Sequence, residues 1–425
     1  MPAPGGPLSR RAFLARLGAL PLVMPALGAA ALAAPSTRRS PRALILLWLD
    51  GGLSHVDSFD CKPESSPDVR GALRSIRGKL PGTFVNERLV RVAARLDRVA
   101  LLRSLSHGEG NHDRGAQYLL CGTRPSPVLA SPALGAIAAL REERGDGELP
   151  AYIAVPDAPL EGGAGFLPPS CAPFAVGGDP SRADFAVRDL TPRARDETQR
   201  LLAMLDAQDG APRSASEAAR DRFVRQAHAL AHEDALRDAF ALAHEPAERR
   251  ARYGAHRLGQ SCLLATRLVQ HGARVVLVRD VGWDHHRDIA RELDTGFPPK
   301  LQALDEALGA LLDDLRDGPL AGRAVLCVAS EFGRTPRLNP SGGRDHWPRA
   351  QSVLLAGAGV REGVVVGATD ARGEEPSERP LAPPELFATL VHLLGVPDAP
   401  LTTQDGRPVR VVADGVEPIP EVLAP

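Results

Sequence analysis

"ALILLWLDGGLSHVDSFD", residues 43–60, joins an unbroken apolar run to a segment of carboxylates, serines and one histidine. A strand that helices cover on both faces reads as a continuous apolar run, because neither face meets water. Residues 43–49 therefore predict a buried strand of a parallel sheet. The polar residues that follow would lie at the carboxyl end of this strand, where open α/β sheets form their binding sites.

The rest of the chain repeats this pattern. Five more apolar runs predict strands, at residues 98–105, 152–155, 273–280, 324–330 and 352–357. Apolar residues recur at helical spacing between them, at residues 86–97, 195–208, 216–244, 255–271, 300–316 and 384–394. This alternation predicts an α/β fold, a doubly wound, mostly parallel sheet with helices on both faces. Charged, Ala-rich residues 195–250 predict a helical insertion, which is either a lid over a site or part of its rim.

Composition excludes few classes of protein. The chain has 425 residues, a formal net charge of -1 and 24% charged residues, which gives no reason to expect nucleic acid as a partner. Five cysteines are scattered without a Cys-x-x-Cys pair. Cys262 and Cys327 fall in apolar runs and are expected to be core thiols. At most, we expect one disulfide, from Cys61 or Cys121 to Cys171.

The N-terminus indicates export. "SRRAFL", residues 9–14, is similar to the core of a twin-arginine signal, and a mildly apolar stretch leads to a small-residue cleavage pattern at residues 31–33. A membrane anchor is the alternative, but the stretch is short and broken by Gly and Pro. We expect a periplasmic or extracellular protein, with the twin-arginine export machinery as a partner and no stable membrane span after signal removal. The predicted organisation is a signal peptide at 1–33, a linker at 34–42 and one α/β domain at 43–425.

Four polar segments follow predicted strands, at residues 50–60, 106–114, 281–288 and 330–348. Each segment alone is explained by a turn or a polar loop. Together they place carboxylates and imidazoles at one edge of the sheet, a combination that suits Zn, Mn or Fe, whereas carboxylates alone suit Mg or Ca. We therefore predict a site for one or two divalent ions, two ions lying about 3.5–4 Å apart. The identity of the metal stays open among these five.

Longer motifs carry a resemblance to a known family. They are "LLWLDGGLSHVDSFD", "GNHDRGAQYLLCG", "GWDHHRDI", "SEFGRTPRLNPSGGRDHWP" and the closing "ATDARG" and "LFATLVHLLG". These motifs resemble the domain of unknown function 1501 family, whose members commonly carry twin-arginine signals. The family looks like a divergent, sulfatase-like branch of the alkaline phosphatase and sulfatase superfamily. The resemblance covers the chain from about Leu44 onward and implies an alkaline phosphatase-like fold with a metal site at the carboxyl edge of the sheet.

The resemblance also implies which residues bind metal. Carried over by position, the predicted ligands are Asp50, Asp284, His286, Glu331 and His346. Phe332 stands where the superfamily usually has a metal-binding histidine. No Ser, Thr or Cys stands where the superfamily has its nucleophile, because His112 or Asn111 takes that place at the start of the helix after the second strand.

These residues lead to one hypothesis and one alternative. The hypothesis is an exported metal-dependent hydrolase of phosphate or sulfate esters, small or polymer-borne, with a metal-bound hydroxide as nucleophile. His112 would be a further ligand or the general acid/base. Arg334 and Arg114 would hold the anionic oxygens, or would simply pair with nearby carboxylates. The alternative is a non-catalytic, metal-containing binding or scaffold protein of the same fold.

Overall fold

The computed structural model describes residues 42–142, 148–187, 234–293 and 295–425. The predicted signal peptide, nearly all of the predicted linker, the helix predicted at 195–208 and most of the one predicted at 216–244 lie outside the described residues. Within the described ranges, no helix has the length and apolar character needed to cross a membrane.

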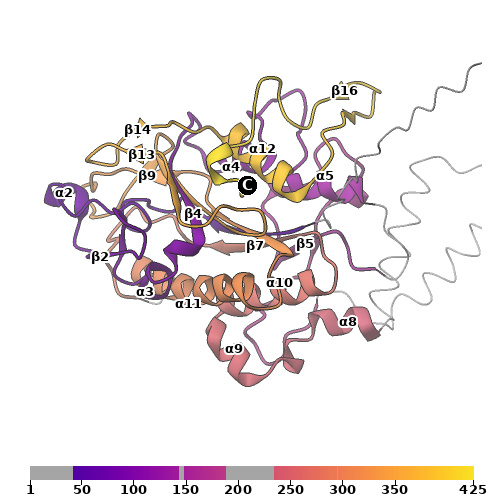
Figure 1. Cartoon of the computed structure of the whole chain (residues 1–425), viewed down its shortest axis with the longest axis horizontal. Helices are drawn as coiled ribbons and strands as arrows, with labels where there is room; N and C mark the ends of the chain where they lie inside the picture. Colours follow the sequence, from indigo (N-terminus) through magenta and orange to yellow (C-terminus); the bar gives the residue numbers. More distant parts are fainter. Residues whose placement is uncertain (1–41, 143–147, 188–233, 294) are drawn as a thin grey trace, which may run out of the picture. The chain divides into compact units, whose positions relative to one another are not determined.

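Eight strands of the described residues form the central sheet, in the order β12-β4-β11-β8-β1-β7-β5-β6 (Figure 1). Each of the six predicted apolar runs forms one of these strands. All neighbouring pairs run parallel except those of β11, which is antiparallel to both β4 and β8. The predicted α/β sheet, mostly parallel, is confirmed. The bounds are β1 (Ala43–Asp50), β4 (Val99–Leu105), β5 (Tyr152–Val155), β6 (Phe174–Ala175), β7 (Val275–Val281), β8 (Ala324–Ala329), β11 (Gln351–Gly357) and β12 (Val364–Val366).

Strand β1 explains why its sequence is apolar throughout. Its side chains alternate between two separate hydrophobic cores, one on each face of the sheet. One core receives Ile45, Leu47 and Leu49, and the other receives Leu44, Leu46 and Trp48. A strand whose two faces are both covered has no position where a polar side chain would meet water.

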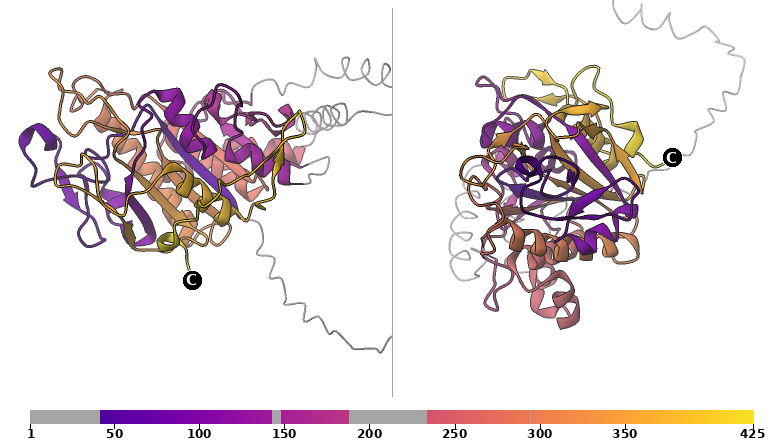
Figure 2. Two further views of the ribbon diagram at one scale, coloured as in Figure 1. Left: turned by 90° about the horizontal axis from the view of Figure 1, so that it is seen from above. Right: turned by 90° about the vertical axis from the view of Figure 1, so that its left-hand side faces the viewer.

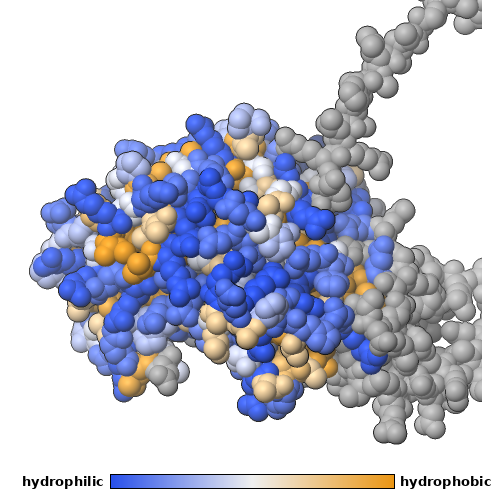
Figure 3. Space-filling view, turned by 60° about the horizontal axis from the view of Figure 1, so that its bottom comes forward, coloured by the Kyte–Doolittle hydropathy of each residue, from blue (hydrophilic) through white to orange (hydrophobic). Residues whose placement is uncertain are grey.

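Helices form the outer two layers (Figures 1 and 2). On one face lie α3 (Val90–Ala93), α9 (Ala247–Tyr253), α10 (Arg257–Gln270) and α11 (Phe297–Arg316). On the other face lie α4 (His112–Cys121), α5 (Leu134–Arg141) and α12 (Pro383–Leu394). The surface around α9 to α11 is mostly hydrophilic (Figure 3). α9 and α11 therefore turn apolar side chains to the sheet and most of their polar ones to solvent, whereas α10 is buried almost throughout, its polar residues Gln260, Ser261, Thr266 and Arg267 included.

Smaller elements complete the described residues. Two short helices are α2 (Pro67–Arg70) and α8 (Asp234–Phe240). Four two-stranded pairs join β2 (Ser75–Arg77) to β3 (Phe84–Asn86), β9 (Gly333–Arg334) to β10 (His346–Trp347), β13 (Ala368–Thr369) to β14 (Pro376–Glu378), and β15 (Leu401–Thr402) to β16 (Pro408–Val409).

One sequence-based expectation about the fold is wrong. The helix predicted at 86–97 is only the single turn α3 followed by a 3-10 turn at Leu96–Arg98, because Asn86 ends β3 and its side chain accepts a hydrogen bond from the backbone of Arg88. The sequence allowed at most one disulfide, and the structure has none among the five cysteines, four of which are buried. The thiol of Cys121 instead faces the carbonyls of the two loops that pack beside it.

The direction of β11 decides which loops meet. Strands β1, β4, β7 and β8 all run one way, so their carboxyl ends lie at one edge of the sheet. Because β11 runs the opposite way, its amino end lies at that same edge. The segment before β11, which contains β9 and β10, therefore lies beside the loops that follow β1, β7 and β8.

We expect Leu47→Ala to lower the free energy of unfolding by about 3 kcal/mol, because Leu47 is fully buried in the central strand and its loss leaves a cavity. Urea unfolding measures this change. The matched variant Leu160→Ala removes a leucine that is 92% exposed and should change the free energy by less than about 0.5 kcal/mol. Equal effects in the two variants would contradict the described core.

Candidate metal centre

The turn after β1 lets two neighbouring loops come close. Gly51 has a φ of 122° and Gly52 one of 81°, conformations that favour glycine. A Cβ at Gly51 would lie 2.6 Å from the backbone nitrogen of Asp284, and one at Gly52 would lie 2.7 Å from the ring of Phe332. The two glycines therefore allow the chain after β7 and the chain after β8 to pack directly against the end of β1.

Helix α4 begins at His112, at the same edge. Asn111 caps the helix, since its side chain accepts a hydrogen bond from the backbone N–H of Arg114 at 3.2 Å. One turn further, Gly115 lies so close to the loop after β8 that a Cβ there would be 3.1 Å from the carbonyl oxygen of Glu331. The cap and the close packing together hold His112 beside the tip of β8.

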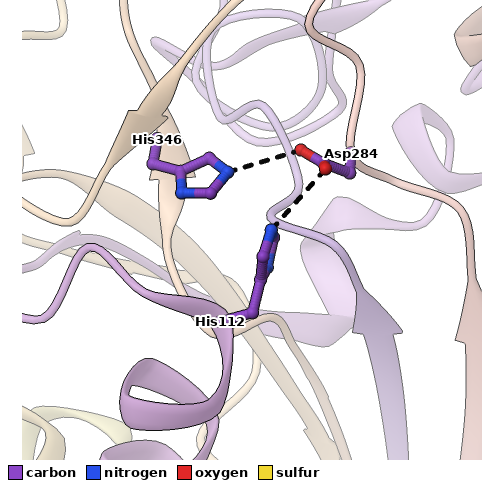
Figure 4. Close-up of side chains that lie close together, drawn as sticks. All are labelled: His112, Asp284 and His346. Atoms are coloured by element: carbon purple, nitrogen blue, oxygen red, sulfur yellow. Dashed lines mark ion pairs between the residues drawn. The ribbon is translucent and has the colours of Figure 1, made fainter.

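Three histidines converge on the carboxylate of Asp284. His286 and His346 place Nε2 at 3.0 and 3.5 Å from Oδ1, and His112 places Nε2 at 3.6 Å from Oδ2. Figure 4 shows His112 and His346 pointing at this carboxylate from different elements. In the described residues, ligand atoms of His112, Asp284 and His346 all lie within 4.8 Å of one another, close enough to share a metal ion.

The three imidazoles share one arrangement. In each ring Nδ1 faces an oxygen that only accepts hydrogen bonds, so a neutral ring carries its proton on Nδ1 and keeps a lone pair on Nε2. Metal-binding histidines in proteins are oriented in this way. The Nδ1 partners are the carboxylate of Asp345 for His286 (2.7 Å), the carbonyl of Gly110 for His346 (2.8 Å) and the carboxylate of Glu331 for His112 (2.5 Å).

Glu331 lies behind His112 and is fully buried. Besides His112, its Oε1 accepts the backbone N–H of Gly51 at 2.9 Å, and its Oε2 lies 2.9 Å from the hydroxyl of Ser330. That hydroxyl in turn accepts the backbone N–H groups of Gly52 and Leu53. Glu331 therefore orients His112, and backbone hydrogen bonds hold the hydroxyl of Ser330 in place.

Asp50 stands at the end of β1 but does not join the group around Asp284. Its Oδ2 accepts from Nε of Arg279 at 2.5 Å, and Arg279 also donates to Asp157 at 2.8 Å. Sequence reasoning missed Arg279, although a charged residue near the end of an otherwise apolar run is a visible signal.

Both predicted anion-binding arginines are in ion pairs. Arg114 is half exposed, and its side chain donates to Glu109 at 2.7 Å. Arg334 is fully buried and donates to Asp284. The pairing with carboxylates that the sequence left open as an alternative is thus what the structure describes for both residues.

A second buried ion pair shapes the loop before His346. The side chains of Arg344 and Asp57 are 0% and 1% exposed, with one N–H···O contact at 2.9 Å between them. Arg344 also donates to three backbone carbonyls, those of Val69, Thr335 and Pro336. Asp57 therefore holds the loop that carries Asp345 and His346 through its pair with Arg344.

This geometry can be compared with known proteins. The family described as "Protein of unknown function (DUF1501)" matches residues 41–423. The chain belongs to this family. The resemblance inferred from the sequence motifs is therefore confirmed over nearly the whole predicted domain. No curated protein matches the chain.

Solved structures of other proteins resemble this DUF1501 chain only at low sequence identity. An alkaline phosphatase from the Antarctic bacterium TAB5 is 13% identical, with 84% of this chain and 99% of that chain covered and a TM-score of 0.39. The lipoteichoic acid synthase LtaP from Listeria monocytogenes is 9% identical, with 88% and 75% covered and a TM-score of 0.38. The protein Ps i-CgsB is 12% identical, with 84% and 73% covered and a TM-score of 0.38. Similarity at this level says nothing about the chemistry of the site.

The environment of this DUF1501 site shifts its pKa values in different directions. The hydrogen bond to Glu331 raises the pKa of His112 above its usual value, whereas burial lowers the pKa of His346. Burial acts to raise the pKa of Asp284, but the hydrogen bond and charge of Arg334 outweigh it and leave the pKa lowered. An ionised carboxylate beside imidazole lone pairs is a donor set that fits Zn, Mn or Fe.

The raised pKa of His112 predicts a pH-dependent contribution to stability in the metal-free chain. The folded pKa lies above the unfolded value of ~6.5, so the contribution is full below that pH and is lost as pH rises through the folded pKa. We expect the stability difference between wild type and His112→Gln, measured by urea unfolding with a chelator present, to shrink as the pH rises above about 6.5. A difference that stays constant above this pH would contradict the described His112–Glu331 pair.

Proposed function

We propose that the chain is an exported, metal-dependent hydrolase of phosphate or sulfate esters. One observation carries the proposal: three imidazoles present Nε2 toward the carboxylate of Asp284, and each has its Nδ1 held by an oxygen acceptor. The proposed ligands are His112, Asp284, His286 and His346. Glu331 and Asp345 orient two of them, and such partners raise the basicity of a ligating imidazole.

A divalent ion held there would supply Lewis acidity, which polarises an ester oxygen and makes water more acidic. The residues of the chain supply the rest. The centroid of the Phe332 ring lies 5.0 Å from that of His112 and 4.7 Å from that of His346. This apolar ring therefore keeps water from that side of the site. Because His112 is the first residue of α4, the positive end of the helix dipole lies beside the site and favours an anionic substrate.

Water is the proposed nucleophile. The hydroxyl of Ser330 is buried and held by backbone groups, so it is not available for attack. No serine, threonine or cysteine stands at the start of α4. Export is part of the proposal because of the twin-arginine-like segment at residues 9–14, which gives a periplasmic or extracellular location.

The same observation about Ser330 also favours a second candidate, a metal-containing binding protein without turnover. Both candidates require the metal and differ only in catalysis. A hydrolysis assay of the metal-loaded protein separates the two candidates, with phosphate monoesters, phosphate diesters and sulfate esters as substrates. Hydrolysis that disappears in Asp284→Asn supports the enzyme, and bound metal without hydrolysis of any of the three classes supports the binding protein.

We expect Asp284→Asn and His346→Ala each to weaken zinc or manganese binding by at least about 100-fold. Each variant removes a proposed ligand, and loss of a ligand should lower the metal affinity more than the roughly 10- to 100-fold typical for loss of a residue that orients a ligand. Isothermal titration of the metal-free, folded protein measures the affinity. The controls Asp414→Asn and His392→Ala change exposed side chains outside the site and should bind as wild type does. Wild type that binds neither metal would rule out the proposed function.

Glu331→Gln should weaken binding of the same metals by about 10- to 100-fold without abolishing it, because the amide orients His112 less well than the buried carboxylate does. The matched control is Glu362→Gln, whose glutamate is 52% exposed and pairs with Arg316 on the surface. If Glu331→Gln abolishes binding as completely as Asp284→Asn does, then Glu331 is itself a ligand, as the family resemblance implied.

A further inference from the structure

The hydrogen bonds of Arg334 leave nothing for a substrate. Its side chain is 1% exposed. Four of its five N–H groups donate to oxygen: Nε to the carbonyl of Gly52 at 2.9 Å, Nη1 to the carbonyl of Arg344 at 3.0 Å, and Nη2 to both the carbonyl of Gly51 and Oδ1 of Asp284. The guanidinium is therefore enclosed by three backbone carbonyls and one carboxylate.

The fifth N–H, on Nη1, faces Nε2 of His286 at 3.4 Å. A buried donor or acceptor that loses its partner costs about 1–3 kcal/mol, and more when a charge is involved. If Arg334 turned toward a substrate, it would leave several buried oxygens unpaired at once. Arg334 therefore stays where it is, and the role of anion clamp that the sequence suggested does not fit its contacts.

The enclosure around Arg334 has the composition of a cation site. Backbone carbonyls and a carboxylate are the ligands that hard divalent cations take. Here a guanidinium fills that position, directly beside the carboxylate toward which the three histidines point. The positive charge of Arg334 thus occupies the position beside Asp284 that a second metal ion would take if two ions shared this carboxylate.

The other carboxylates of the site are engaged elsewhere. Glu331 accepts from Gly51, Ser330 and His112, and Asp50 accepts from Arg279. Asp345 accepts from Nδ1 of His286 and from Asn339. Among the described residues, ligand atoms of His112, Asp284 and His346 lie within 4.8 Å of one another, and His286 adds an Nε2 that lies 3.0 Å from Asp284. The set therefore offers at most the four ligands that one tetrahedral ion takes.

We propose that this site holds one divalent ion and that Arg334 is a built-in second cation, which fills the neighbouring oxygen-lined position and fixes Asp284 for the ion. This inference rests on the proposed metal site and adds to it the number of ions and the role of Arg334. Arg334 is thus a positioning residue that acts through Asp284.

The number of ions is tested on the wild-type chain. Purified protein is loaded with excess zinc or manganese, desalted, and analysed for metal and protein content. We expect one equivalent per chain. Two equivalents would overturn the inference and leave the proposed function standing. No bound metal would instead overturn the proposed metal site itself, so the two failures are distinguishable.

The role of Arg334 is tested with Arg334→Ala and added guanidinium. Without Arg334, Asp284 loses its main donor, and we expect zinc affinity to fall by about 10- to 100-fold. Guanidinium ion at about 20 mM, far below the molar concentrations that unfold proteins, should refill the enclosure and restore the affinity. Ammonium at the same concentration lacks the planar set of donors and should restore less.

The control is Arg410→Ala, which removes an arginine that is 63% exposed and should respond to neither addition. If Arg334→Ala binds zinc as tightly as wild type does, Arg334 has no positioning role. If the variant folds but guanidinium does not restore its zinc affinity, the inference that a guanidinium group fills the oxygen-lined position is wrong. If Arg334→Ala does not fold, the metal stoichiometry of the wild type still decides the proposal.

Discussion

Two opposite charges, Glu331 and Arg334, are buried three residues apart directly after the central strand β8. A buried charge is tolerated only when it is paired or fully hydrogen-bonded. Glu331 meets this condition with groups from the turn after β1 and from the start of α4. Arg334 meets it with carbonyls of the same turn and with Asp284 after β7. The need to satisfy these two charges draws all the loops of the site to one place.

The sheet makes this possible because its strands present the right groups at one edge. β1 lies between β7 and β8, so the turn after β1 contacts both neighbouring loops. The reversed direction of β11 brings the preceding hairpin to the same edge, where His346 pairs across from Arg334. The proposed ligands therefore come from α4, the loop after β7 and β10, three segments that are distant in the sequence.

Much of the fold was predictable because buried strands leave a direct trace in the sequence. A strand covered on both faces is apolar along most of its length, and all six such runs form strands. The residues of the site were predictable as a group because each polar segment follows one of those strands. The short α3 was not predictable, since Asn86 belongs to β3 and a turn that it makes with the backbone of Arg88 overrides the apolar spacing of residues 86–97.

The roles of individual charged residues could not be predicted. Asp50, Asp284 and Glu331 all follow strands, yet one pairs with Arg279, one faces three imidazoles and one lies buried behind His112. Arg344 and Asp57 form a buried pair although 287 positions separate them in the chain. A residue type and its place after a strand do not say which donor will lie opposite it.

The sequence by itself determined the alternation of strands and helices, the family, and the gathering of carboxylates and histidines at one edge of the sheet. Those features depend on burial and on local order along the chain, which composition and periodicity record. Only the tertiary structure decided which carboxylate faces the imidazoles, which one orients them, and that Arg334 is enclosed rather than free. Those outcomes depend on hydrogen bonds between distant segments, and such bonds are chosen by geometry that exists only after the sheet has formed.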